Sequence, residues 1–187
     1  IVPISGTTST KTLLFKNGSA EARSQVMHGA YFINIVDFDE SDTEHVCPDV
    51  ADGFTRGERT YLEPRVDPDL NYWNERDYRQ RSIDNYQGSV YFVQGLQDWN
   101  VDSHMIFPLY QQMKDAGFDV KGIFGQWGHD YPDQWQKHDD IDKDNGGTAF
   151  PQMTRWDWAQ DLFEWFEYYL QNRGPKPDLN VQVQRHD

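Results

Sequence analysis

The sequence predicts an α/β fold in which a mostly parallel sheet is flanked by helices. Two short apolar runs, Val90–Val93 and Val120–Phe124, are separated by a segment with the spacing of an amphipathic helix, and strand, helix and strand in that order form a parallel pair. Each run ends in a glycine-containing loop; the first loop carries Asp98 and the second carries His129. The carboxyl ends of parallel strands lie side by side, and ligands and catalytic groups gather there. We therefore expect these two side chains to meet.

The chain opens with Ile1–Ile4, an apolar segment that we interpret as another core strand. A polar turn follows, and residues 11–85 then lose strong periodicity, with aromatic residues scattered among acidic and turn-forming ones. We interpret residues 11–85 as a helical cap inserted between strands of the sheet. Short helical pieces are expected at Ala20–Asn34 and Glu58–Leu62.

The segment Asp102–Ala116 has the apolar spacing of one helix face. Gly117 is placed to cap its C-terminus. Pro108 either kinks this helix or marks its first turn. The face consists of Met105, Ile106, Leu109, Tyr110 and Met113.

The last helix gives the clearest pattern. Thr154 with Asp157 three residues later suggests a capping box, and Gly174–Pro175 is expected to end the helix. Asp178–Arg185 then alternates as a half-buried strand does. The predicted buried stripe of the helix consists of Ala159, Leu162, Phe163, Phe166, Tyr169 and Leu170.

The amino-acid composition excludes some classes of binding partner for this protein. The 187 residues carry a formal net charge of −14, and such a field repels nucleic acid and anionic membrane surfaces, so we expect neither as a partner. The acidity is typical both of an ordinary acidic protein and of one from a salt-rich cytoplasm. The single cysteine, Cys47, excludes an internal disulfide. No apolar run approaches the roughly 18 residues that span a bilayer and no signal peptide is visible, so a cytoplasmic location is expected.

Asp98 and His129 form the candidate catalytic pair. Histidine is the usual general base near neutral pH, and a carboxylate partner fixes its tautomer and stabilises the imidazolium. We predict a hydrogen bond of about 2.6–3.2 Å between the two side chains. An Asp followed along the chain by a His is the second half of the Ser…Asp…His order of α/β-hydrolases. The alternative is a surface Asp and an unrelated loop His.

Four segments carry a resemblance to a known family: Gly95–Val101, Trp127–His129, Tyr72–Tyr78, and Trp156–Tyr169 followed by Pro177–Val183. They resemble segments of the Xaa-Pro dipeptidyl-peptidase family and its cocaine-esterase-like relatives, the last one being similar to the passage of that family into a C-terminal β-domain. Gly95–Val101, with the sequence GLQDWNV, is similar to the acid-bearing motif of that family, and Trp127–His129 is similar to its histidine motif. Tyr72–Tyr78 resembles the element that precedes the acid strand. The resemblance covers roughly residues 70–183 well and residues 1–10 loosely. It implies an α/β-hydrolase fold with Asp98 as the acid and His129 as the base of a Ser-His-Asp triad.

The chain departs from the family in one respect. The nucleophile of the family sits in a Gly-x-Ser-x-Gly elbow, and no such pattern occurs in the sequence; Ser5, Ser9 and Ser19 lack the flanking glycine pair. We expect a C-terminal piece of a larger hydrolase that is inactive alone. The expected division is residues 1–10 and 86–174 as the C-terminal part of the catalytic domain, 11–85 as the cap insertion, and 175–187 as the start of a following β-domain or a tail.

The resemblance implies a serine hydrolase fragment of the Xaa-Pro dipeptidyl-peptidase type. The expected partners are a peptide or a small ester or amide substrate and the remainder of the same hydrolase, with homo-oligomer formation left open. No cofactor and no metal site is predicted. An acyl esterase or amidase of the same superfamily is the first alternative. A non-catalytic acidic binding module is the second.

Three other features of the sequence have simpler interpretations than a functional site. Cys47, with His45 two residues away, resembles no nucleophile elbow and is more simply a buried cysteine. Asp140, Asp142 and Asp144 take the first, third and fifth places of an EF-hand loop, but its twelfth place is Pro151 rather than Glu, which favours a solvated acidic loop. The aromatic residues near the predicted pair could line a pocket, although most such residues belong to a core; they are Trp99, Trp127, Tyr131 and Trp135.

Overall fold

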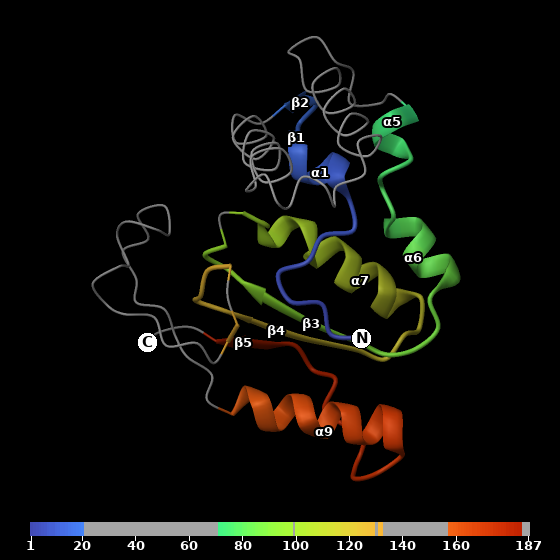
Figure 1. Ribbon diagram of the computed structural model, residues 1–187, viewed down its shortest axis with the longest axis vertical. Coiled ribbons are helices and arrows are strands. Elements are labelled where there is room, and N and C mark those ends of the chain that lie inside the picture. The colour runs from blue at the N-terminus through green and yellow to red at the C-terminus, as the bar shows by residue number, and fades with distance from the viewer. Residues whose placement is uncertain (21–70, 99, 130, 133–156, 185–187) are drawn as a thin grey trace, which may run out of the picture. The chain divides into compact units, whose positions relative to one another are not determined.

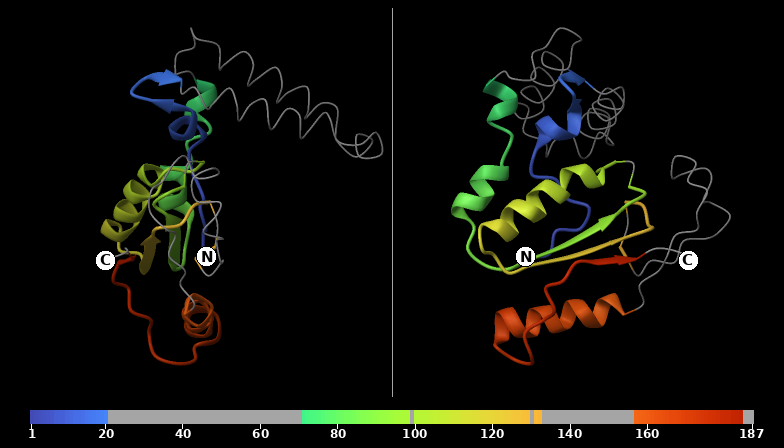
Figure 2. Two further views of the ribbon diagram at one scale, coloured as in Figure 1. Left: turned by 90° about the vertical axis from the view of Figure 1, so that its left-hand side faces the viewer. Right: turned by 180° about the vertical axis from the view of Figure 1, so that it is seen from behind.

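The computed structural model describes residues 1–20, 71–98, 100–129, 131–132 and 157–184. These residues form two compact units, one from residues 1–8 and 79–184 and the other from residues 9–20 and 71–78. Figure 1 and Figure 2 show the first unit as a sheet with helices packed against it. The helices of the described part include none that is long and apolar enough to cross a membrane.

The sheet of the first unit is parallel. Strand β3 (Val90–Gly95) pairs with β4 (Val120–Gly125) in a register that places Gly95 opposite Gly125. On the other side of β4 lies β5 (Gln182–Gln184), also parallel. The mixed α/β class with a parallel sheet that the sequence predicts is thus confirmed.

The segment Ile1–Ile4 lies along the free edge of β3. The Tyr91 N–H donates to the Ile1 carbonyl and the Val93 N–H donates to the Pro3 carbonyl, each at 3.0 Å, and Ile4 bridges Val93 in the parallel sense. The predicted strand is therefore present only as an extended, hydrogen-bonded edge segment. It is not a core strand, because Ile1 is exposed and the other three residues are only partly buried.

Every residue of β3 and β4 is buried, as expected for a parallel sheet covered on both faces. Alternate residues point to opposite faces, so each strand supplies both sides of the core. One face packs against helix α7 (Phe107–Asp115) and the other against helix α9 (Trp158–Gln171). The α7 face consists of Val90, Phe92, Val120 and Phe124 with Ile106, Leu109, Tyr110 and Met113. The α9 face consists of Tyr91, Val93, Ile123, Trp127, Trp158 and Trp165.

The helix between the two strands begins and ends for local reasons. A short 3-10 turn, η1 (Ser103–Met105), precedes α7, and Pro108 lies in the first turn of α7, where its missing N–H leaves no hydrogen bond unmade. Of the two interpretations of Pro108, a kink or the first turn of the helix, the structure therefore favours the first turn. Gly117 follows the last turn with φ at +87°, a left-handed conformation that glycine adopts without strain. Its predicted capping role is confirmed.

The structure corrects the prediction for the last helix. Asp157 is the N-cap residue of α9 rather than its third residue, so no capping box starts from Thr154, which lies outside the described residues. The helix ends at Gln171, and its C-cap residue Asn172 has a left-handed conformation, two residues before Gly174. Three residues of the predicted stripe, Ala159, Phe163 and Leu170, are exposed. The stripe that faces the sheet is instead centred on two tryptophans and consists of Trp158, Leu162, Trp165, Phe166 and Tyr169.

A buried ion pair fastens α9 to the sheet. Lys121, on β4, is almost completely buried and pairs with Asp161 of α9. The same carboxylate accepts a hydrogen bond from the Tyr91 hydroxyl, and the Lys121 ammonium lies 4.8 Å from the centre of the Tyr91 ring. Because the charge of Lys121 is paired and hydrogen-bonded, the sheet tolerates it in the core.

A second polar contact joins the end of α9 to the start of β4. The Tyr169 hydroxyl and the Lys176 ammonium both donate to Asp119, each at 2.8 Å. The hydrogen bond from Lys176, supported by that from Tyr169, holds the pKa of the Asp119 carboxyl below its ordinary value. Burial and the bond to Asp119 raise the pKa of the Tyr169 hydroxyl.

Strand β5 belongs to this same sheet. The sequence predicts a strand in this region, and the structure contains one, but it pairs with β4 rather than starting a separate sheet. Its three residues therefore lie in the first unit, and the assignment of residues 175–187 to the start of a following β-domain or a tail stays a prediction. The division into catalytic domain and cap remains a prediction.

The second unit is described only at its ends. Helix α1 (Thr10–Leu14) is capped by the Ser9 hydroxyl, which accepts the Thr12 N–H. It leads into a hairpin of β1 (Phe15–Lys16) and β2 (Ser19–Ala20). Phe15 packs edge-on against Trp73 of helix α5 (Asn71–Asn74), with ring centres 5.1 Å apart. The helices expected at Ala20–Asn34 and Glu58–Leu62 fall essentially outside the described residues.

Candidate active site

The candidate site lies where β3 and β4 end. Each strand closes with a glycine, and the two glycines are paired in the register, so the loops that follow start side by side. The Leu96 N–H donates to the Gly125 carbonyl at 2.7 Å, and the Gln97 N–H donates to the Trp127 carbonyl at 3.1 Å. Two backbone hydrogen bonds thus tie the loop of Asp98 to the loop of His129.

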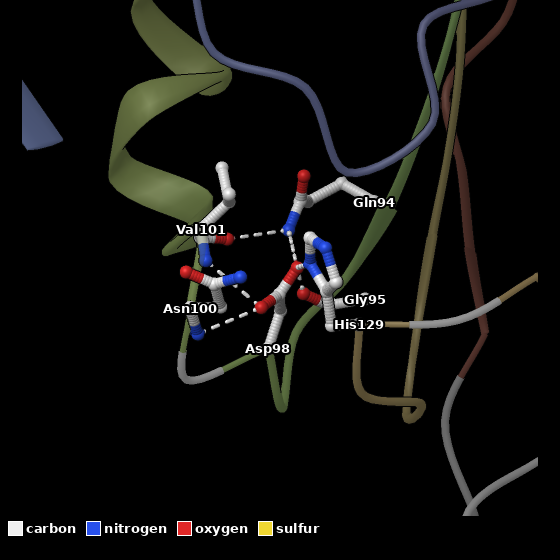
Figure 3. Close-up of polar contacts among 6 residues, drawn as sticks. All are labelled: Gln94, Gly95, Asp98, Asn100, Val101 and His129. Atoms are coloured by element: carbon white, nitrogen blue, oxygen red, sulfur yellow. Dashed lines mark hydrogen bonds and ion pairs between the residues drawn. The ribbon is translucent and has the colours of Figure 1, made fainter. Parts of the chain in front are cut away.

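The two predicted side chains meet. The Nδ1 atom of His129 lies 2.9 Å from Oδ2 of Asp98 (Figure 3), within the range predicted from the sequence. The Asp98 side chain is fully buried, whereas 45% of the His129 side chain is exposed. The imidazole is accessible from solvent, whereas the carboxylate is shielded from water.

The backbone fixes the other carboxylate oxygen of Asp98. Oδ1 accepts the N–H groups of Asn100, at 2.8 Å, and of Val101, at 2.9 Å. This local turn is one that an aspartate side chain favours. Because both donors belong to the loop that carries Asp98, this loop orients the carboxylate independently of His129.

The arrangement determines which histidine nitrogen can act as a base. When Nδ1 carries a proton and donates it to Asp98, the neutral ring leaves Nε2 unprotonated and available to accept a proton. The buried carboxylate then stabilises the imidazolium that forms. The pair can therefore perform the base and orienting steps of nucleophilic catalysis.

Two glycines permit this close approach. A Cβ atom on Gly95 would lie 2.2 Å from the Trp127 carbonyl oxygen and 2.3 Å from that of Gly128. A Cβ on Gly125 would lie 2.0 Å from the Trp127 ring. Trp127 is buried over Gly125 and packs in the core facing α9. It supports the histidine loop and is not an open pocket wall.

The serines of the described chain have other surroundings. Ser9 caps α1 and Ser19 lies in β2. Ser5 is buried, with φ at +47°, and within the described residues no hydrogen bond joins it to His129. The structure therefore gives none of the three a nucleophile's contact with the base.

Seven of the remaining candidates lie outside the described residues. They are Cys47, His45, Asp140, Asp142, Asp144, Trp99 and Trp135. Tyr131 is half exposed, with its ring centre 6.0 Å from that of Trp158. Within the described ranges, no group of three or more His, Cys, Asp or Glu side chains is placed to hold a metal ion.

Gln94 is a residue of the candidate site that was not predicted from the sequence. This residue is the fifth of β3, is fully buried, and contacts Asp98 through its side-chain nitrogen at 3.2 Å. The signal was present in the sequence, because a polar amide interrupts a buried apolar strand immediately before Gly95.

The sequence of the chain is similar to those of known peptidases. The chain matches the X-Pro dipeptidyl-peptidase family, S15 family, over residues 1–131. It is 24% identical to a putative Xaa-Pro dipeptidyl-peptidase of Bacillus anthracis over 148 residues, which cover 78% of this chain and 20% of that protein. It is 31% identical to the Xaa-Pro dipeptidyl-peptidase of Ligilactobacillus salivarius over 97 residues, which cover 50% of this chain and 12% of that protein.

The chain thus spans about a fifth or less of the length of these relatives. The family match includes both Asp98 and His129 and extends over more than half of the chain. The chain belongs to the X-Pro dipeptidyl-peptidase family, S15 family, of peptidases.

Proposed function

We propose that this chain supplies the acid and the base of a serine hydrolase of the Xaa-Pro dipeptidyl-peptidase type. The observation that carries the proposal is the contact between buried Asp98 and accessible His129 at the ends of two parallel strands. The nucleophilic serine would lie outside this chain, in the remainder of what we call the intact hydrolase. Family membership and the names of both relatives support this assignment.

The proposed first step is acylation. The Nε2 atom of His129 removes the proton of the serine hydroxyl while the oxygen attacks the carbonyl carbon of the scissile amide. The proton on Nδ1 stays with the imidazole, and the Asp98 carboxylate stabilises the positive charge of the ring. The imidazolium then gives its Nε2 proton to the leaving amine, which breaks the C–N bond and leaves an acyl-enzyme.

Deacylation repeats the same proton transfers with water. His129 removes a proton from the attacking water and returns it to the serine oxygen, which releases the acid product. Backbone N–H groups that stabilise the oxyanion would come partly from the residue after the serine, outside this chain. The partners implied are a peptide substrate and the rest of the hydrolase, within an α/β-hydrolase fold that residues 11–85 would cover as a cap.

The test is substrate selectivity in the intact hydrolase. We expect kcat/KM for a Gly-Pro-anilide to exceed that for a Gly-Ala-anilide and for a simple aryl ester, with loss of activity after treatment with a serine-directed phosphonate. A preference for the ester would favour the acyl esterase alternative. Binding without turnover of any of these substrates would favour an acidic binding module and overturn the proposal.

The isolated chain provides the matched negative control. It contains His129 and Asp98 but, on this proposal, has no serine to form the acyl-enzyme. We expect no hydrolysis and no phosphonate labelling. Labelling accompanied by turnover would show that a nucleophile lies within these 187 residues.

A further inference from the structure

We propose that Gln94 is a positioning residue that sets the direction of the Asp98 carboxylate, and thereby that of His129. The inference rests on the proposed function, because positioning matters only if the pair performs catalysis. Gln94 is not one of the three triad residues and is too deeply buried to reach a substrate.

The Gln94 amide nitrogen lies at the centre of the acid loop. It is 2.7 Å from the Val101 carbonyl, 3.1 Å from the Gly95 carbonyl and 3.2 Å from Oδ2 of Asp98 (Figure 3). Gly95 and Val101 are the two ends of that loop. One side-chain amide therefore closes the loop and contacts the carboxylate it presents.

The chemistry of the neighbours determines which way the amide faces. If the group were turned over, its oxygen would face three other oxygens with no proton between them. The nitrogen therefore faces Asp98, and Oε1 points away from it (Figure 3). Oε1 is buried, and no described residue donates to it.

Among the described residues this oxygen has no donor, which argues against a purely stabilising role for Gln94. A buried acceptor without a donor destabilises a folded protein, whereas an apolar side chain of the same shape makes no such demand. Gln94 thus occupies a core position where methionine or leucine would satisfy the packing. The benefit that fits the geometry is the N–H donor that Gln94 supplies to Asp98 and to the ends of the loop that carries it.

That N–H completes the surroundings of the carboxylate. Oδ1 of Asp98 accepts hydrogen bonds from the N–H groups of Asn100 and Val101, and Oδ2 accepts hydrogen bonds from the Gln94 amide and the His129 ring. These four bonds match the acceptor capacity of a carboxylate. Within the described residues, Gln94 is the one hydrogen-bonding partner of Oδ2 besides His129. Without it, the carboxylate can rotate about the anchored Oδ1, and the imidazole that follows Oδ2 loses its fixed direction.

The experiment replaces Gln94 by methionine in the intact hydrolase. Gln94→Met keeps the length of the side chain and removes the donor. Because small misplacements of reacting groups slow catalysis by up to about 100-fold, we expect kcat to fall about 10- to 100-fold while KM stays within about twofold, since Gln94 does not touch substrate. The thermal midpoint should change little, because removal of the unpartnered oxygen offsets part of the cost of leaving the Val101 carbonyl without the Gln94 donor.

Two further variants sharpen the test. Gln94→Glu keeps the size and polarity but places a second carboxylate against Oδ2, so it should lose at least as much kcat as Gln94→Met. Gln112→Met makes the same chemical change on the exposed side of α7 and should match the wild type. The low-field proton resonance of His129 Nδ1–H reports the bond to Asp98 directly. It should shift or broaden in both Gln94 variants and stay unchanged in Gln112→Met.

Each result decides the inference. An unchanged kcat and resonance in Gln94→Met would overturn it, and so would a loss of activity in proportion to a loss of stability, which indicates packing alone. If His129→Ala retained its rate, the proposed function would fail whatever Gln94 does. If His129→Ala were inactive and Gln94→Met fully active, only the role of Gln94 would fail.

Discussion

Gly95→Ala should separate the two halves of the candidate site. The added Cβ would lie 2.2 Å and 2.3 Å from the carbonyl oxygens of Trp127 and Gly128. Ordinary contact begins at 3.4 Å, so the histidine loop has to retreat by the difference, about 1.2 Å. Both obstacles are backbone atoms, so no side-chain rotation can relieve them. The retreat also stretches the hydrogen bond from the Gln97 N–H to the Trp127 carbonyl.

The displacement sets the expected magnitudes. Overpacking of this kind destabilises a protein by about 1–3 kcal/mol, and moving the base by about 1 Å lowers turnover about 100-fold. Urea denaturation of this chain measures the first effect, and kcat of the intact hydrolase measures the second. Gly6→Ala is the matched control, because its Cβ would meet only Pro3, at an ordinary 3.5 Å. A Gly95→Ala variant with the stability and kcat of the wild type would refute the reasoning.

Three further perturbations test the packing and the charge of the chain. Lys121→Met leaves the largely buried Asp161 without its cation and should lower the free energy of unfolding by about 3 kcal/mol; Lys121→Met with Asp161→Leu should recover most of that loss, and no recovery would show that the pair is not coupled. Asp119→Asn removes a carboxyl whose pKa is lowered from 3.8 by Lys176 and Tyr169. A lowered folded-state pKa stabilises the protein above the unfolded value, and the benefit disappears as pH falls through the folded value. The thermal midpoint of Asp119→Asn should therefore lie below the wild type at neutral pH and converge with it once the pH falls below the lowered folded-state pKa of Asp119; a gap that persists under these acidic conditions contradicts the assignment. Finally, screening of the −14 net charge should raise the thermal midpoint of this chain between low salt and molar KCl, and a flat curve would indicate an ordinary acidic surface.

Features that depend on the local periodicity of apolar residues could be predicted from the sequence. The apolar runs at Val90–Val93 and Val120–Phe124 identified two buried strands, and the glycine loops after them brought Asp98 to His129. The contact follows because parallel pairing in register forces the two loops to start together. The C-terminal cap of α7 at Gly117 could be predicted for the same reason, because it depends only on the residues next to it in the sequence.

Features that depend on distant partners could not be predicted. Lys121 interrupts an apolar run, and only its pairing with Asp161, on another element, explains its burial. The stripe of α9 was misassigned because Phe163 and Leu170 are as apolar as the tryptophans that face the sheet, so composition alone did not identify the buried side. The place of β5 beside β4 and the bonds of Gln94 likewise depend on three-dimensional pairing.

The central claim is that His129 is the base of a serine hydrolase and Asp98 its orienting acid. The direct measurement is kcat for release of the chromophore from a Gly-Pro-anilide by the intact hydrolase carrying His129→Ala, with an unchanged thermal midpoint as the control for folding. Because triad members act as a unit, we expect kcat to fall by about four orders of magnitude or more, and Asp98→Asn to be similarly severe. A His129→Ala enzyme that kept most of its rate would contradict the account.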